Sequence, residues 1–160
     1  MKKLLIFGTI IILLVTFLVF LFFYSVWSKE QAIEKQMVSE AYEKVPALYK
    51  VEDIDYFSGD KHYYFIRGKS IAGNDLLVWI NKEEVHFTYL FDWVTKDEII
   101  NKVLEYDQKL IVKRITMGLN FEGIPIYEVL FTDDEGRLGY QYYKIETGEL
   151  IKTYKLGKLR

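Results

Sequence analysis

The chain begins with an apolar run and continues with shorter periodic segments. From Leu4 to Tyr24 there is no charged residue, and nearly every position is apolar. A helix of that length spans roughly 31 Å, which matches the hydrocarbon core of a bilayer. Because only a helix satisfies its own backbone hydrogen bonds in lipid, this run predicts one transmembrane helix.

The alternative for this run is a cleaved secretory signal. The apolar part of such a signal is usually about 7 to 15 residues and ends in an A-x-A-like site. Here the run is longer, and Tyr24-Ser25-Val26-Trp27 lacks small residues at the paired positions. The pattern favours an uncleaved anchor. A lipid-modified cysteine is excluded, because the chain has no cysteine.

The flanks of the run predict its orientation. Lys2 and Lys3 precede it, so the positive-inside rule places the N-terminus in the cytoplasm. Tyr24 and Trp27 lie where an outer aromatic belt is expected. We therefore expect a single-pass protein of the cell membrane, with the bilayer as a partner and residues 28–160 outside the cytoplasm.

Two later segments carry the chemistry of a helix start. Ser28-Lys29-Glu30-Gln31 and Thr95-Lys96-Asp97-Glu98 both match a capping box, with a hydroxyl at the cap and Gln or Glu three residues on. Pro46 ends the first of these helices. The alternative at the first start is that the membrane helix runs through Ser28 without a break.

Each predicted helix is followed by segments with strand composition. The expected strands are 51–57, 62–67, 76–80 and 85–90, then 110–119, 124–131, 138–145 and 150–154. The intervening segments are rich in Gly, Asn and Asp, which favour hairpin turns. Both halves thus consist of a helix and an antiparallel meander, which predicts an α+β fold.

The two halves also align with one another. Residues 79–85 match residues 144–150 at an offset of 65, and one such repetition indicates a tandem duplication. The predicted organisation is a cytoplasmic stub and transmembrane anchor over 1–27, one domain over 28–92 and a second over 93–160. Domains of about 60 residues have marginal cores, so we expect the two to pack as one body, with 91–94 as a short hinge.

At this point the residues resemble a known family. Tyr142-Tyr143-Lys144-Ile145-Glu146-Thr147-Gly148-Glu149-Leu150-Ile151 resembles the closing hairpin of a PepSY domain. Tyr63-Tyr64-Phe65-Ile66-Arg67-Gly68, followed by Leu77-Val78-Trp79-Ile80, looks like the N-terminal domain of the TseB-like (formerly YpmB-like) cell-wall elongation regulators. That family has the same order of a short basic N-terminus, one membrane helix, a TseB-like domain and a PepSY-like domain.

The resemblance implies two cystatin-like units in tandem, each a helix packed on an antiparallel meander, TseB-like over 28–92 and PepSY-like over 93–160. It also implies a Gram-positive, membrane-anchored protein that binds a class B penicillin-binding protein, a monofunctional transpeptidase, and influences cell-wall elongation and cell shape. The family supplies no catalytic residue that could be carried over to this chain.

The charge and the amino-acid composition argue against several classes of function. The 160 residues carry a net charge of −2, and the expected exported part carries −4, which argues against a nucleic-acid binder. The absence of cysteine excludes disulfides, a cysteine nucleophile and a thiolate metal site.

One motif suggests catalysis on spacing alone. Ser58-Gly59-Asp60-Lys61 matches S-x-x-K, the nucleophile motif of penicillin-recognising enzymes. That chemistry needs Ser and Lys one turn apart at a helix start, with companion S-D-N and K-T-G elements. Here the motif lies between two strands and both companions are missing, so a plain hairpin turn is the better interpretation.

The sequence contains no clear motif for binding a metal ion or a cofactor. The only histidines, His62 and His86, lack the spacing of a zinc motif and are expected on strand surfaces. Asp133-Asp134-Glu135 lacks the twelve-residue loop of a calcium site and is expected to be an acidic turn. With no G-x-S-x-G and no P-loop, we expect no enzyme, no metal, no cofactor and no small-molecule substrate.

The 13 tyrosines and three tryptophans are the remaining candidates for a functional surface. Neighbours on a strand point to opposite faces, so about half of these side chains belong to a core and the others could form a partner surface. The candidates for that surface are Tyr64, Trp79, Trp93, Tyr127 and Tyr143. Core packing is the competing interpretation for each of them.

Two functions are consistent with these patterns. The first is a non-catalytic interaction protein that docks on a membrane-embedded wall synthase. The second is a PepSY-type peptide-binding or peptidase-inhibiting module at the cell surface. The sequence favours the first, because no linker separates the predicted anchor from the predicted fold.

Overall fold

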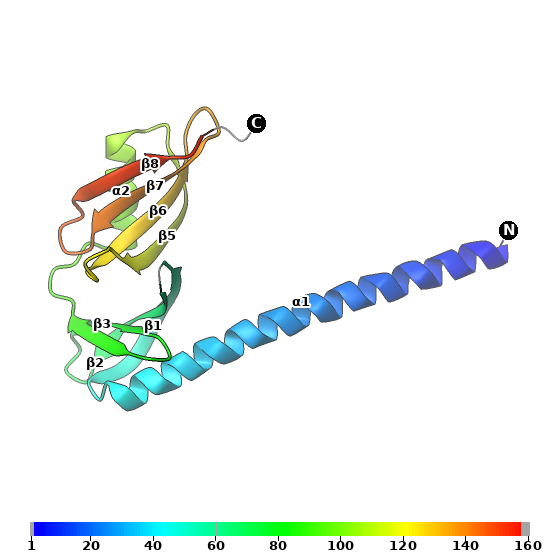
Figure 1. Ribbon diagram of the computed structural model, residues 1–160, viewed down its shortest axis with the longest axis horizontal. Coiled ribbons are helices and arrows are strands. Elements are labelled where there is room, and N and C mark those ends of the chain that lie inside the picture. Colours follow the sequence, from blue (N-terminus) through cyan, green and yellow to red (C-terminus); the bar gives the residue numbers. More distant parts are fainter. Residues whose placement is uncertain (1, 60, 158–160) are drawn as a thin grey trace. The chain divides into compact units, whose positions relative to one another are not determined.

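The computed structural model describes residues 2–59 and 61–157 (Figure 1). Asp60 of the predicted turn lies outside the described residues, and so do the side chains of Lys2 and Lys3. By their internal contacts the residues fall into two compact units, Met1–Ser39 and Glu40–Arg160.

Helix α1 (Lys2–Lys44) contains the predicted apolar run. Its stretch Ile10–Lys44 is long and apolar enough to cross a membrane, with a mean hydropathy that reaches 2.7. This helix is compatible with a single-pass anchor.

The prediction of a separate helix start at Ser28 is wrong, and the alternative is confirmed. Helix α1 continues through this position, and the Ser28 hydroxyl donates to the carbonyl of Ser25 at 3.0 Å instead of capping a new helix. The reason is physical. A cap requires the preceding residue to leave the helix, whereas nothing between Gly8 and Pro46 interrupts the backbone hydrogen bonds of a helix.

Eight strands form two antiparallel sheets, each a simple meander, and the predicted α+β class is correct at this level. Sheet A has the order β1 (Leu48–Ser58), β2 (His62–Ser70), β3 (Asp75–Ile80) and β4 (Val85–Tyr89). Sheet B has the order β5 (Ile111–Leu119), β6 (Pro125–Thr132), β7 (Leu138–Lys144) and β8 (Leu150–Lys155).

Helix α2 (Lys96–Tyr106) lies between the two sheets in the sequence, and its predicted capping box is present. The Glu98 amide donates to the Thr95 hydroxyl at 3.2 Å, and the Thr95 amide donates to the Glu98 carboxylate at 2.7 Å. Two amides at the start of the helix are thereby satisfied. Ile99 and Val103, one turn apart, are both fully buried.

One buried cluster draws on both sheets and on α2. Sheet A supplies Phe65 and Leu77, and sheet B supplies Val129 and Phe131, all of them 0% exposed. The complete cluster consists of Tyr63, Phe65, Leu77, Ile99, Val103, Leu110, Met117, Tyr127, Val129, Phe131, Tyr143 and Ile145. The prediction that the two meanders form one body is therefore confirmed for residues 40–160.

The strands β1 and β5 meet at the edges of their sheets. The Met117 amide on β5 donates to the Asp55 carboxylate on β1 at 3.2 Å. The Phe57 ring on β1 lies against Gly118 on β5, at the place where a Cβ atom would stand. Glycine at 118 therefore permits the close approach of the two sheets.

The β6–β7 hairpin is organised by Asp133, which is 4% exposed. Its carboxylate accepts the Arg137 amide at 2.9 Å and the Glu135 amide at 3.1 Å, and it pairs with the Arg137 guanidinium at 2.8 Å. The hydrogen bond from the Arg137 side chain is the main reason that the pKa of Asp133 falls to about 2. The acidic turn expected from the sequence is thus held mainly by Arg137, with the Lys155 ammonium at 3.7 Å from the same carboxylate.

This turn gives a pH prediction. Because the pKa of Asp133 is lower in the folded chain than its ordinary value of 3.8, its contribution to stability is present above that value and is lost as the pH falls towards about 2. Asp133→Asn should reduce the free energy of unfolding at neutral pH. The difference between the two proteins should shrink over that acid interval, as measured by urea unfolding at a series of pH values. A difference that stays constant would contradict the assignment.

Candidate functional site

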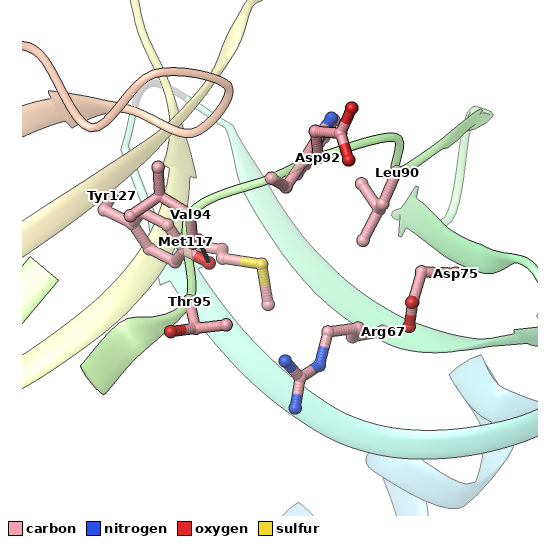
Figure 2. Close-up of a pocket in the computed structure, with 9 residues that line it drawn as sticks. Arg67, Asp75, Leu90, Asp92, Val94, Thr95, Met117 and Tyr127 are labelled. Atoms are coloured by element: carbon pink, nitrogen blue, oxygen red, sulfur yellow. Dashed lines mark hydrogen bonds between the residues drawn. The ribbon is translucent and has the colours of Figure 1, made fainter. Parts of the chain in front are cut away.

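A pocket of about 230 Å³ lies where the segment 90–95 crosses from sheet A to α2 (Figure 2). Its walls combine apolar side chains of the shared core with a few polar groups. The lining residues are Arg67, Asp75, Leu90, Asp92, Trp93, Val94, Thr95, Met117 and Tyr127.

Arg67 is the principal cationic group of the pocket. It lies on β2, paired in register with Leu77 of β3, and so projects from the face of sheet A that carries the shared core. Figure 2 shows its side chain extending from β2 beneath the 90–95 segment. Its Nε atom is buried and has no hydrogen-bond partner among the residues described. A buried donor without a partner costs free energy, so this group is suited to a ligand or a water molecule.

The neighbouring acid is already neutralised. Asp75 lies beside Arg67 in the pocket wall, and its carboxylate pairs with the Lys69 ammonium at 2.7 Å. Asp92, in the same wall, has a φ of 58°, a left-handed conformation that strains a residue with a side chain. Strain of this kind concentrates at turns and at functional sites.

Tyr127 holds the segment in place from the other side. Its hydroxyl donates to the Val94 carbonyl at 2.9 Å, the dashed line in Figure 2. Burial raises the pKa of Tyr127 to about 12, so the hydroxyl remains a neutral donor at physiological pH. The Val94 amide in turn donates to the Ile145 carbonyl at 3.1 Å, which ties the segment to the end of β7.

Lys96, the first residue of α2, forms an ion cluster next to this segment. Its ammonium pairs with Asp55 at 2.8 Å and with Asp53 at 2.9 Å, both on β1. Burial by itself lowers the pKa of Lys96, but the hydrogen bonds to Asp55 and Asp53 outweigh it and leave the pKa above 10.5. Since Asp55 also accepts the Met117 amide, the cluster joins α2, β1 and β5.

The side chains of the pocket offer groups that could hold a ligand. Among the residues that line the pocket there is no histidine and no serine, and the Thr95 hydroxyl is occupied by Glu98 at 2.9 Å. The pocket offers a guanidinium donor in an apolar setting, which suits the recognition of a polar group.

The five predicted partner-surface aromatics do not form one surface. Tyr127 and Tyr143 are 4% and 2% exposed and belong to the shared core, so placing them on a surface was wrong. Both lie on the inward row of sheet B, where large apolar area gains most from burial. Tyr64, Trp79 and Trp93 are partly exposed, and their contact with a partner stays a prediction.

The residues weighed for catalysis are engaged in structural contacts. The Lys61 ammonium pairs with Glu84 at 2.8 Å, and Ser58 ends a strand instead of starting a helix. The His62 ring lies 3.0 Å from the Tyr56 hydroxyl, and the His86 ring stacks on Trp79. In the part of the chain that the structure describes, no group of three or more His, Asp or Glu residues could hold a metal ion.

Sequence reasoning missed both Arg67 and the Lys96 cluster. Arg67 was noted only as part of a strand motif, although an arginine on the core-facing side of a strand is itself a signal. Lys96 and Asp53 are 43 positions apart, and no local pattern connects them.

Two comparisons with known proteins bear on the family. No family model matches the sequence. The chain is 28% identical over 158 residues to the probable cell wall elongation regulator TseB of Bacillus subtilis (strain 168). The aligned region covers 94% of this chain and 96% of that protein. The solved structure of the YpmB protein from Bacillus subtilis matches with a TM-score of 0.62 and 22% identity, over 76% of this chain and 96% of the other. The resemblance to the TseB-like cell-wall elongation regulators, predicted from the residues, is therefore confirmed in sequence by TseB and in fold by YpmB.

Proposed function

We propose that this chain is a non-catalytic, membrane-anchored interaction protein that regulates cell-wall elongation by binding a class B penicillin-binding transpeptidase. The observation that carries the proposal is the similarity to TseB, a probable cell wall elongation regulator, along nearly the whole chain. The single long apolar helix supports a membrane anchor, because it has the length and composition of a membrane span.

The topology belongs to the same proposal. Lys2 and Lys3 before the apolar run favour a cytoplasmic N-terminus, and Tyr24 and Trp27 after it favour the outer interface. Residues 28–160 would then lie outside the cytoplasm, where wall synthesis takes place in a Gram-positive cell.

The two domains are part of the proposal as well. The four-stranded meander of each sheet supports a TseB-like domain over 28–92 and a PepSY-like domain over 93–160. Ile99 and Val103 of α2 share a buried cluster with Val129 and Phe131 of sheet B, which supports a cystatin-like packing of helix on sheet in the second domain.

A cross-linking experiment tests the function. A photoreactive amino acid placed at the partly exposed Tyr64, Trp79 or Trp93 in the full chain, in living cells, should capture a class B transpeptidase identified by mass spectrometry. The same amino acid at the buried Tyr143 is the matched control and should capture nothing. Repeated capture of a peptidase, with no transpeptidase, would reject this function in favour of the second one.

That second function is a PepSY-type peptide-binding or peptidase-inhibiting module. The observation that favours it is the pocket with the half-buried Arg67, whose buried Nε atom has no hydrogen-bond partner among the described residues, since a guanidinium is a natural partner for a peptide carboxylate. Arg67→Met should weaken peptide binding under this function and leave transpeptidase capture unchanged under the first.

The continuity of α1 gives a prediction about height above the membrane. A Gly/Ser insert of about 20 residues between Trp27 and Ser28 replaces a rigid helix by a coil with an r.m.s. reach of roughly 25 Å. If the anchor serves to hold the domains beside a membrane-embedded partner, the insert lowers their effective concentration at the contact. Cell elongation should then fall while the expression level and membrane localisation stay unchanged. Normal cell elongation with the insert would contradict the idea that the domains must be held at a fixed distance from the membrane.

A further inference from the structure

The pocket beneath the segment 90–95 contains two polar groups that have no partner among the described residues. The buried Nε atom of Arg67 donates to none of them. The carboxylate of Asp92, an exposed residue of the same pocket, forms no hydrogen bond or ion pair with a described residue either. In Figure 2, Asp92 lies on the connecting segment above the Arg67 side chain. One pocket therefore offers a ligand both a donor and an anion.

The surroundings of the pocket carry an excess of negative charge. Asp53 lies opposite Arg67 in the register of β1 and β2, and it shares the single ammonium of Lys96 with Asp55. The remaining acid beside the guanidinium, Asp75, is already neutralised by its own lysine. A ligand with only a carboxylate would add a further negative charge next to this cluster. The pocket is therefore complementary to a ligand that brings a positive charge of its own.

The buried Nε atom of Arg67 requires that the ligand also carry an acceptor. A simple amine would leave this donor unpaired, which costs free energy. A carboxylate is the best acceptor, because a hydrogen bond between two charged groups is roughly twice as strong as one between neutral groups. The C-terminus of a peptide has a carboxylate without an ammonium, and the N-terminus has an ammonium without a carboxylate. A free amino acid carries both groups on one carbon atom.

The size and the walls of the pocket define the rest of the ligand. At about 30 Å³ for each water molecule of the liquid, the volume of about 230 Å³ holds roughly eight non-hydrogen atoms, and valine and leucine are of about this size. The side chains of Leu90, Met117 and Tyr127 supply apolar surface, and Figure 2 shows the Met117 thioether between the connecting segment and Arg67. A charged side chain would lose its hydration there without gaining a partner.

We infer that this pocket is a binding site for a free α-amino acid with an apolar side chain, held in its zwitterionic form. Its carboxylate accepts from the Arg67 guanidinium, its ammonium pairs with the Asp92 carboxylate, and its side chain packs beside Met117. The inference concerns binding and involves no chemical step. It goes beyond the proposed function, because the capture of a transpeptidase does not require this pocket to be filled.

The test is a titration of the full chain in lipid nanodiscs, with isotope-labelled methionine methyl groups observed by NMR. L-Leucine should shift the Met117 signal, assigned with Met117→Leu, in a saturable way. The signal of Met37, a buried residue of α1 outside the pocket, is the internal control and should not move. No shift up to the solubility limit of leucine would mean that the pocket holds water only, and it would overturn the inference.

Three analogues of leucine test the chemistry of the ligand. N-acetyl-leucine lacks the ammonium and resembles the C-terminus of a peptide, and leucinamide lacks the carboxylate and resembles the N-terminus. Each should bind at least about tenfold more weakly than leucine, the usual effect of losing a hydrogen bond to a charged group. Isobutane-free glycine, with no side chain to pack, should also bind more weakly. Equal affinity for N-acetyl-leucine or for leucinamide would assign the pocket to a peptide end and overturn the inference.

Matched variants test the two protein groups. Arg67→Met and Asp92→Asn should each weaken leucine binding at least about tenfold. Asparagine tolerates the left-handed φ of 58° at position 92 as well as aspartate does, so the segment keeps its conformation. Arg114→Met is the control, because Arg114 is exposed on β5 and does not line the pocket. If Arg67→Met fails to fold, Asp92→Asn decides alone, and unchanged leucine affinity in that variant would overturn the inference.

The outcome is separable from that of the proposed function. Saturable leucine binding at Met117, with no transpeptidase captured in cells, would retain the amino-acid site and reject the transpeptidase as partner. Transpeptidase capture by a chain whose Met117 signal does not respond to leucine would reject the amino-acid site alone.

Discussion

Phe131→Ala should lower the free energy of unfolding by about 3–5 kcal/mol, the usual cost of deleting a buried aromatic ring. The Phe131 side chain is 0% exposed, and its ring fills the space beside Gly139, its partner on β7. Removing the ring leaves a cavity beside Gly139. Because the side chain of glycine is a single hydrogen atom, β7 has no side chain at this position that could fill the cavity. The matched control is Phe121→Ala, which removes the same ring from a position that is 99% exposed and should cost almost nothing.

How the lost free energy of unfolding is shared between sheet A and sheet B is more informative than its size. Phe131 belongs to sheet B, but its cluster includes Phe65 and Leu77 of sheet A. Denaturant-dependent hydrogen exchange on the full chain should therefore show both sheets losing the same free energy, as in one cooperative unit. A loss confined to sheet B would contradict the shared core.

Lys96→Met should cost about 2 kcal/mol, because it leaves two carboxylates without their cation at a partly buried position. The Lys96 side chain is 29% exposed and that of Asp55 is 12% exposed, so solvent screens the cluster only in part. Methionine has a helix propensity similar to that of lysine, so α2 itself should be little affected.

The control is an ion pair of the same type at the surface. Lys109 pairs with Asp134 at 3.0 Å, and the two side chains are 70% and 52% exposed. Lys109→Met should therefore cost less than about 1 kcal/mol. A double-mutant cycle of Lys96→Met with Asp55→Asn, measured by urea unfolding, should give a clear coupling energy. If Lys96→Met costs no more than Lys109→Met, the cluster does not join the sheets.

The strands could be predicted closely because their signals are local. Alternating apolar residues and Gly-containing turns placed all eight strands, with every end correct to within three residues. The capping box at Thr95 was correct for the same reason, since its two partners are three positions apart. Ser28 has the same local chemistry, yet the continuous helix on its N-terminal side overrides it.

The pocket could not be predicted, because its parts come together only in three dimensions. Arg67, Val94 and Tyr127 lie on β2, on the connecting segment and on β6, and no spacing along the chain brings them near each other. The burial of Tyr127 and Tyr143 has the same origin. Alternation puts each of them on one face of sheet B, but only the packing of sheet A and α2 determines which face is the core.

The central claim, that this chain binds a class B transpeptidase at the membrane, has one direct test. The full chain and a purified class B transpeptidase, each labelled with one fluorophore outside the membrane, are reconstituted into the same liposomes. The proposed function predicts energy transfer that an excess of the unlabelled chain abolishes by competition. No transfer above that between the chain and an unrelated single-pass protein at equal density, with the transpeptidase folded and able to bind penicillin, would contradict it.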